Sequence, residues 1–145
     1  MKKVDVAVIG AGTAGLNARR AAAKEGASVV MIESGPYGTT CARVGCMPSK
    51  LLIHPAEIAH EIRHAERFGI YPGDVKVDTR AILSRVRAER DRFVGFVSDA
   101  VERIPEEQKL RGYARFLDDN TLDVDGTRVE ASSIVIATGT YPWSP

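Results

Sequence analysis

Residues 4–15 read VDVAVIGAGTAG, a short apolar run followed directly by three spaced glycines. The apolar part, Val4–Ile9, is rich in β-branched residues and predicts a buried strand. Gly10, Gly12 and Gly15 have the spacing that cradles a dinucleotide pyrophosphate when a strand precedes it and a helix follows. The first glycine allows the tight turn, the second lets the backbone approach the phosphates, and the third lets the helix pack on the strand.

The segment after the glycines completes this pattern. An Ala-rich helix is predicted to run to about Glu25, where Gly26 stops it. A second buried strand, Ser28–Ile32, follows and would lie parallel to the first strand. The helix start offers free N–H groups and a positive dipole end to phosphates, so Thr13 and Ala14 in its first turn are further candidate ligands.

Glu33 ends the second strand, 23 residues after Gly10. This spacing is typical of the acid that binds ribose hydroxyls, and its charge would repel a 2′-phosphate, which favours FAD or NAD over NADP. Ser34 follows it as a further candidate. The alternative is a glycine turn without ligand and a solvated Glu33, but strand, helix and acid in register favour the nucleotide site.

Composition limits the classes of function. The chain has 145 residues, 44% of them apolar and 27% charged, with a net charge of +1, as expected of a soluble globular domain. Scattered Lys and Arg give no nucleic-acid footprint, and no apolar run reaches about 18 residues, so neither nucleic acid nor membrane is expected as a partner. Asp5 interrupts the apolar N-terminus where a signal peptide would continue, which predicts a cytoplasmic protein.

Spacing and turn residues predict the remaining elements. They are a loop over 34–45 that delivers both cysteines, a helix over about 45–68 with a kink at Pro55, a connector over 69–77, a helix from Asp78 or Thr79 to about Ile104, and strands near 109–116, 121–124, 127–129 and 134–137. Asp125-Gly126 predicts a two-residue hairpin. The expected fold is α/β and Rossmann-like, with a parallel sheet and a small β-meander, and residues 1–145 form one part of such a domain.

Cys41 and Cys46 are the two cysteines of the chain. In a continuous helix, residues five apart rise about 7.5 Å, and disulfides rarely tolerate Cα separations above about 7 Å. A bond between the two cysteines therefore needs an irregular segment, which Gly45 permits. Three interpretations stay open: a redox-active pair, two unrelated thiols, or half of a metal site. Without a second cysteine pair, zinc bound by thiolates is not expected.

Residues 60–64 read HEIRH and match the H-E-x-x-H signature of zinc proteases. On a helical wheel His60 and His64 lie opposite the apolar face, which indicates a solvated surface. A catalytic zinc needs a third protein ligand and a dry cleft, and no candidate for either is present. We therefore expect no metal site.

Several motifs together resemble the pyridine nucleotide–disulfide oxidoreductases, with dihydrolipoamide dehydrogenase as the nearest branch. They are the glycine fingerprint, Glu33, GTTC at 38–41, VGC at 44–46, PSK at 48–50 and ATG at 137–139. The resemblance implies that Cys46 lies against a flavin as the charge-transfer thiolate and that Cys41 is the interchange thiol. It implies that Lys50 lies near flavin N5. The same likeness adds Thr40, Ala137, Thr138 and Gly139 to the FAD-contacting residues.

The resemblance implies an FAD enzyme that exchanges hydride with NAD(H) and passes electrons through a Cys41–Cys46 disulfide to a dithiol or disulfide substrate, most simply dihydrolipoamide. An intact enzyme of this kind is a homodimer. NAD-binding and dimerisation domains are absent from residues 1–145, so the isolated chain is expected to be inactive. The alternatives are a mercuric- or glutathione-reductase-like flavoenzyme, or a nucleotide-binding module whose cysteines do no chemistry.

The chain departs from the family pattern at two positions. The family commonly has a second glycine where Thr39 stands, and an asparagine where Arg43 stands. Thr39 places a side chain where the loop nears the cofactor. Arg43 places a cation between the thiols, which would favour thiolate at Cys41 or change the substrate that is accepted.

Overall fold

The computed structural model describes residues 1–141, 143 and 144, and the chain divides into two compact units. We call Met1–Thr39 together with Val97–Pro145 the sheet unit, and Thr40–Phe96 the helical unit. None of the described helices is both long enough and apolar enough to cross a lipid bilayer.

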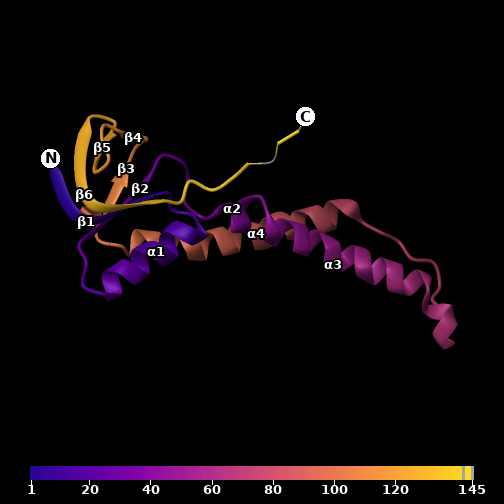
Figure 1. The fold of residues 1–145 in the computed structure, drawn as a ribbon. Coiled ribbons are helices and arrows are strands. Elements are labelled where there is room, and N and C mark those ends of the chain that lie inside the picture. The colour runs from indigo at the N-terminus through magenta and orange to yellow at the C-terminus, as the bar shows by residue number, and fades with distance from the viewer. Residues whose placement is uncertain (142, 145) are drawn as a thin grey trace. The chain divides into compact units, whose positions relative to one another are not determined.

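The sheet unit contains a six-stranded sheet in the order β3-β2-β1-β6-β5-β4 (Figure 1). Its strands are β1 (Lys2–Ile9), β2 (Val29–Glu33), β3 (Lys109–Arg111), β4 (Ala114–Phe116), β5 (Thr121–Val124) and β6 (Thr127–Ile136). Strands β3, β2, β1 and β6 pair in parallel, whereas β6, β5 and β4 form an antiparallel meander. The expected α/β fold with a parallel sheet and a small meander is confirmed.

Strand β1 is paired on both sides. Ala7 is in register with Val30 of β2 and with Ile134 of β6. Helix α1 (Thr13–Lys24) connects β1 to β2 as predicted, and the chain leaves it at Gly26, whose φ of +81° favours glycine. The β-α-β unit read from the sequence therefore forms the centre of the sheet.

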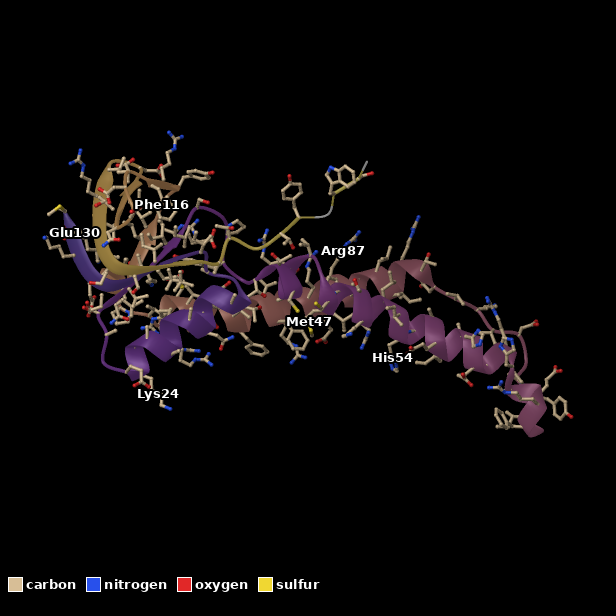
Figure 2. All side chains as sticks on the ribbon, viewed as in Figure 1. Lys24, Met47, His54, Arg87, Phe116 and Glu130 are labelled. Atoms are coloured by element: carbon tan, nitrogen blue, oxygen red, sulfur yellow. The ribbon has the colours of Figure 1, made fainter. Side chains whose placement is uncertain are left out.

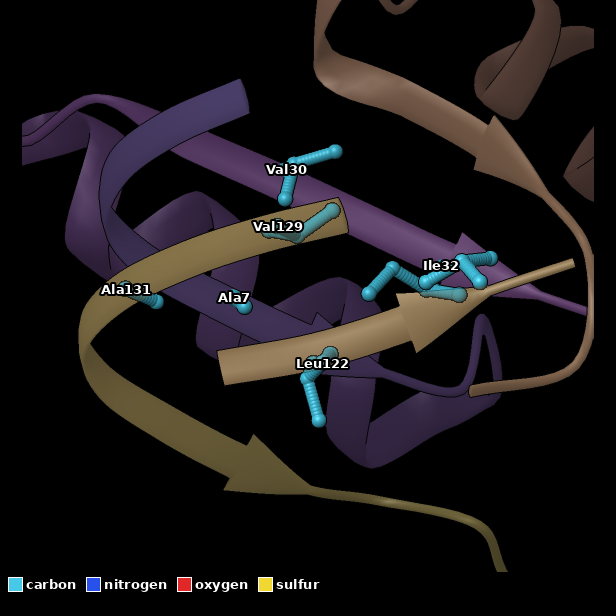
Figure 3. Packing of buried hydrophobic residues seen from close by; sticks show 7 residues of the cluster. Ala7, Val30, Ile32, Leu122, Val129 and Ala131 are labelled. Carbon is cyan, nitrogen blue, oxygen red and sulfur yellow. The ribbon is translucent and has the colours of Figure 1, made fainter. Parts of the chain in front are cut away.

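The core of the sheet unit consists of two apolar clusters. The larger one contains seven buried residues (Figure 3): Ala7, Val30, Ile32, Leu122, Val124, Val129 and Ala131. Met31, between Val30 and Ile32, belongs instead to the second cluster, with Ala11, Val101 and Ile104. Successive residues of a strand face opposite sides, so β2 is buried on both faces, which explains its uninterrupted apolar sequence.

The single strand predicted at 109–116 is wrong, because the chain forms β3 and β4 with a break between them. The Gly112 N–H donates to the Glu33 carbonyl oxygen at 3.1 Å, beside β2. The next N–H, of Tyr113, donates to Asp125 Oδ2 at 3.1 Å. The two strands therefore have different partners: β3 extends the parallel side and β4 closes the meander.

The two strands predicted at 127–129 and 134–137 are also wrong, because they form one strand, β6. Exposed Ser132 and Ser133 interrupt the apolar pattern, but the backbone ladder with β1 runs from Val129 to Ile136. The predicted hairpin between β5 and β6 is confirmed. Asp125 and Gly126 both have positive φ, +46° and +90°, as a type I′ turn requires.

The helical unit contains α2 (Thr40–Arg43), α3 (Cys46–Arg63), the 3₁₀ turn η1 (Ala65–Phe68) and most of α4 (Thr79–Glu102). The structure therefore corrects the loop predicted over 34–45, which contains α2. Because α2 and α3 are separated only by Val44 and Gly45, Cys41 is carried by one helix and Cys46 by the next.

The helix predicted over 45–68 is too long. Regular α-helix ends at Arg63, after which the His64 N–H donates to the Glu61 carbonyl oxygen at 3.1 Å in an i to i−3 pattern that tightens the chain into η1. Pro55 lies inside α3, which continues past it as one element.

Helix α4 begins where the sequence predicted. Asp78 caps it: Oδ1 accepts hydrogen bonds from the Arg80 and Ala81 N–H groups, each at 3.0 Å. The helix ends at Glu102, two residues before the expected Ile104, and the 3₁₀ turn η2 (Glu106–Gln108) then leads into β3.

Candidate functional site

The first glycine of the fingerprint lies against the segment that directly follows β6, near the far end of the chain. Gly10 has a φ of +109°, and a Cβ there would lie 2.2 Å from the Ala137 carbonyl oxygen. The Ala137 N–H donates to the Ile9 carbonyl oxygen at 2.8 Å, which fixes this approach. Two candidate ligands from opposite ends of the sequence, Gly10 and Ala137, are thus neighbours.

Gly12 and Gly15 differ in the space that surrounds their Cα atoms. A Cβ at Gly15 would lie 1.8 Å from the Gly10 carbonyl oxygen and 3.3 Å from Val8 Cγ1, so only glycine fits between α1 and β1. A Cβ at Gly12 would meet no atom within 4 Å, and Gly12 has an ordinary φ of −78°. Nothing in the fold requires glycine at position 12, so its smallness leaves room for a ligand.

The start of α1 suits an anion. Gly12 is the N-cap and accepts the Leu16 N–H at 2.9 Å, whereas Thr13 and Ala14 are exposed. The first turn contains no acidic residue, so no carboxylate neutralises the positive end of the helix dipole. These residues could hold a dinucleotide pyrophosphate, and Thr138 and Gly139, just after Ala137, are exposed.

Glu33 holds the glycine turn by its side chain. Oε2 accepts the Ala11 N–H at 2.8 Å, and Oε1 accepts the Gly35 N–H at 2.7 Å. Each carboxylate oxygen retains a further lone pair, so the carboxylate can still accept hydrogen bonds from ribose hydroxyls. Ser34, between these partners, is exposed.

A polar cavity at the neighbouring strand end was not predicted. It measures about 390 Å³ and is lined by Tyr37, Glu102, Glu106, Lys109, Leu110 and Arg111. The buried Lys109 Nζ lies 2.7 Å from Glu106 Oε1 and donates to the Glu102 carbonyl oxygen at 3.1 Å. The Arg111 guanidinium lies 4.7 Å from the Tyr37 ring centroid.

Part of the lining of this cavity could have been predicted from the sequence. Lys109 is the first residue of β3 and follows a turn that contains Glu106 and Glu107. A lysine so close to two acidic residues in the sequence predicts a local ion pair. Arg111 also donates a hydrogen bond to the Gly35 carbonyl oxygen. This contact spans 76 residues, and no local pattern reports it.

The thiols of Cys41 and Cys46 interact directly in the helical unit. Both cysteines are free, Cys41 half-buried and Cys46 exposed. The two residues lie close enough for the side chain and the backbone N–H of Cys46 both to shift the pKa of the Cys41 thiol. Gly45 makes this possible: a Cβ there would lie 3.1 Å from the Thr40 carbonyl oxygen, which also accepts the Val44 N–H. Figure 2 labels Met47, the next residue along α3.

The contact between the thiols raises the pKa of Cys41. The hydrogen bond to Cys46 is the largest cause, followed by burial and by the charge of a Cys46 thiolate. The Cys46 N–H and the Lys50 ammonium act in the opposite direction and lower this pKa. Two thiols in contact can be oxidised to a disulfide by thiol–disulfide exchange, so this pair is a candidate redox centre.

The predicted site residues therefore form two groups. Gly10, Gly15, Glu33 and Ala137 meet in the sheet unit, whereas Cys41, Cys46 and Lys50 meet in the helical unit. Thr40 is the exposed first residue of α2.

The structure describes the surroundings of both departures from the family pattern. Thr39 has a φ of +57°, a left-handed conformation that is rare for a β-branched residue, which explains why glycine is common there. Arg43 is half-buried and is the last residue of α2, two residues after Cys41, and its expected effect on the Cys41 thiolate or on the substrate stays a prediction.

The H-E-x-x-H segment lies on the surface of α3. His60 and His64 are exposed, their ring centroids are 4.2 Å apart, and Glu61 pairs with Arg67 at 3.5 Å. Among the described residues, no group of three or more His, Cys, Asp or Glu side chains is placed to hold a metal ion.

Residues 4–145 match the family model described as pyridine nucleotide-disulphide oxidoreductase. A dihydrolipoyl dehydrogenase of Thermus scotoductus is 36% identical over 145 residues, covering 98% of this chain and 30% of that protein. A mercuric reductase of Streptomyces lividans is 38% identical over 151 residues, covering 97% of this chain and 31% of that protein.

One solved structure, the Cu(II) complex of the HOCl-induced flavoprotein disulfide reductase RclA from Escherichia coli, has the same fold with a TM-score of 0.70 at 24% identity. It covers all of this chain and 30% of that one. The chain therefore spans about 30% of the length of these relatives.

Proposed function

Because this chain belongs to the pyridine nucleotide-disulphide oxidoreductase family, we propose that it carries the FAD-binding and thiol-bearing part of a flavoprotein disulfide oxidoreductase. In this proposal electrons pass between NAD(H), FAD and the Cys41–Cys46 pair, and from the pair to a dithiol or disulfide substrate. The proximity of the two thiols, close enough for each to influence the ionisation of the other, is the observation that carries the proposal.

The sheet unit would bind the cofactor. Gly12, Thr13 and Ala14 would present backbone N–H groups to the pyrophosphate, and Glu33 would accept hydrogen bonds from the ribose. Ser34, Thr138 and Gly139 would add contacts along the same edge of the sheet. FAD, when bound, supplies two-electron chemistry between a nicotinamide and a thiol pair.

The helical unit would perform the thiol chemistry. Cys46 is the more exposed thiol, and the Cys46 backbone N–H stabilises a thiolate on Cys41. Lys50 adds a positive charge that acts in the same direction. Thr40 anchors the turn between the cysteines through its carbonyl oxygen. The pair can then open and reclose a small disulfide loop without unfolding either helix.

The substrate of the proposed enzyme is a dithiol such as dihydrolipoamide, in keeping with the dihydrolipoyl dehydrogenases among its relatives. A mercuric-reductase-like activity is the alternative, since relatives with that name are similarly close. We further propose that the functional enzyme is a cytoplasmic homodimer that uses NAD(H). A glutathione-reductase-like enzyme is a further possibility within the same chemistry.

Gly12 provides the sharpest test of cofactor binding. Gly12→Val has an ordinary φ and open space at Cβ, so the fold should persist while the side chain blocks the approach of a pyrophosphate. We expect the wild-type chain to bind FAD by calorimetric titration and Gly12→Val to bind at least about tenfold more weakly. Circular dichroism should show the same helix content in both. Equal FAD affinity in the two proteins would contradict the proposed site.

A redox titration tests the thiol pair separately. The chain is equilibrated with mixtures of reduced and oxidised dithiothreitol, trapped by alkylation and analysed by mass spectrometry. A Cys41–Cys46 disulfide with a defined midpoint is the expected result. If both thiols stay reduced under all conditions, the cysteines are not a redox centre, and the chain is a nucleotide-binding module.

A further inference from the structure

Gly35, in the turn after β2, is held through both of its backbone polar groups. Its N–H donates to Glu33 Oε1 at 2.7 Å, and its carbonyl oxygen accepts a hydrogen bond from the Arg111 guanidinium. Glycine has more conformational freedom than any other residue, so such contacts are needed to keep one backbone geometry at this position. Arg111 therefore restrains the residue that donates a hydrogen bond to the Glu33 carboxylate.

The ladder between β2 and β3 brings Arg111 to this turn. Arg111 is in register with Glu33, and the Gly112 N–H donates to the Glu33 carbonyl oxygen at 3.1 Å. Glu33 and Arg111 are the last residues of their strands, so both strands end at the same edge of the parallel sheet. The side chain of Arg111 therefore starts beside Glu33 and reaches the turn that follows it.

A second contact holds the long side chain of Arg111. The guanidinium lies 4.7 Å from the ring centroid of Tyr37, and Tyr37 packs against the second apolar cluster of the sheet unit. A planar guanidinium can stack on an aromatic ring and donate hydrogen bonds in its own plane at the same time. Arg111 is thus attached to the turn at two points, the Gly35 carbonyl oxygen and the Tyr37 ring.

The direction of the Glu33 carboxylate depends on two backbone donors. Oε2 accepts the Ala11 N–H at 2.8 Å, and Oε1 accepts the Gly35 N–H. These hydrogen bonds decide which lone pairs of the carboxylate remain for the hydroxyls of a ribose. A binding group keeps its geometry within about 0.5 Å when supporting contacts lock it. Ala11 is buried, whereas Gly35 is half-buried and is held by Arg111.

We propose that Arg111 is a positioning residue of the nucleotide site: by holding Gly35 it orients the Glu33 carboxylate, which makes the site selective for nucleotides that carry both ribose hydroxyls. The inference rests on the proposed function, because it requires Glu33 to bind the ribose of the cofactor. Arg111 does not touch the cofactor in this proposal. Its effect on the ribose passes through Gly35 and Glu33.

Two nucleotides that differ only in the ribose hydroxyls test the proposal on the 145-residue chain. They are ADP, which corresponds to the adenosine diphosphate half of FAD, and 2′,3′-dideoxy-ADP. Calorimetric titration gives the dissociation constant of each, and the ratio of the two constants reports the contribution of the hydroxyls. Because both probes carry the same phosphates, loss of a positive charge from the protein weakens both equally and cancels in the ratio.

The ratio is measured for the wild type, Arg111→Met, Arg111→Lys and Glu33→Gln, with Arg115→Met as the matched control. Arg115 is an exposed arginine of β4, and its guanidinium lies 5.8 Å from the Tyr113 ring centroid. Arg115→Met therefore removes the same charge and a similar contact with a tyrosine ring, but from the meander. Circular dichroism and thermal unfolding check that every variant is folded.

We expect the wild-type chain to bind 2′,3′-dideoxy-ADP about tenfold more weakly than ADP, because hydrogen bonds to a charged carboxylate are lost. Arg111→Met should lower this ratio to about threefold, and Glu33→Gln should lower it further. Arg111→Lys keeps a cationic donor for the Gly35 carbonyl oxygen and should recover part of the ratio. Arg115→Met should keep the wild-type ratio.

Three results would overturn the inference. Arg111→Met could weaken both nucleotides by the same factor, which would make Arg111 a structural residue. It could bind both as the wild type does, which would show that Glu33 needs no such support, or Arg115→Met could lower the ratio as much. Failure of the proposed function looks different, since the wild-type chain itself would then bind neither ADP nor FAD.

Discussion

The sheet unit and the helical unit differ in how many of their apolar side chains are buried. Of the fifteen buried apolar residues that the structure describes, thirteen belong to the sheet unit, and only Ala42 and Val86 belong to the helical unit. Helix α3 has no buried residue and exposes Leu52, Ile53 and Ile58. The sheet unit can therefore hold backbone atoms in fixed positions, whereas the helical unit leaves its side chains accessible.

This difference corresponds to two kinds of chemistry. A glycine cradle has to match a cofactor that stays bound, and close packing around Gly10 and Gly15 fixes its backbone. A thiol pair has to react with molecules that arrive and leave, and the exposure of Cys46 permits that.

The largest difference in the free energy of unfolding is expected when one glycine in each unit is replaced by alanine. Gly15→Ala forces a Cβ to 1.8 Å from the Gly10 carbonyl oxygen, so we expect a loss of about 3 kcal/mol or more in the free energy of unfolding. Gly95→Ala, in the middle of α4, meets no atom within 4 Å and should gain about 0.5–1 kcal/mol. Urea denaturation measures both, and equal stability of the two variants would contradict the contrast.

A smaller effect should follow from truncating one apolar side chain in each unit. Leu122 is fully buried in the larger cluster, and Leu122→Ala should cost about 3 kcal/mol. Ile58 on α3 is 49% exposed, so Ile58→Ala should cost less than about 1 kcal/mol. Thermal unfolding of both variants beside the wild type checks this. A comparable loss of stability in Ile58→Ala would contradict the contrast, because it would mean that the Ile58 side chain on α3 is buried in solution.

The smallest effect concerns reactivity rather than stability. Since the hydrogen bond that the protonated Cys41 thiol donates to Cys46 is the main cause that raises the pKa of Cys41, Cys46→Ala should lower that pKa and speed alkylation of Cys41 at pH 8 severalfold. Lys50→Gln should raise the pKa and slow the reaction. Peptide-level mass spectrometry after timed iodoacetamide treatment separates the two cysteines.

The pH profile provides the control for this prediction. At a pH well above the ordinary range of thiols, Cys41 is ionised in every variant, and the three rates should converge. Rates that differ by the same factor at all pH values would show that access to the sulfur, and not its pKa, had changed.

Local patterns predicted much of this molecule. The strand–glycine–helix segment, the two-residue hairpin at Asp125-Gly126 and the Asp78 cap each depend on neighbours within a few residues, and all three are confirmed. The break at Gly112 and the continuity of β6 could not be predicted in this way. Both depend on which distant strand accepts each backbone hydrogen bond.

The α/β class, the fingerprint and the presence of two thiols within one short segment all follow from the order of the residues in the chain. Which glycine is structural and which leaves room for a ligand follows from the folded structure, since Gly12 and Gly15 look alike in the chain. The folded structure also decided that Ala137 lies at Gly10 and that Glu33 holds the glycine turn through Ala11. The physical reason is the parallel register of β1 with β2 and β6, which brings together residues separated by up to 127 positions.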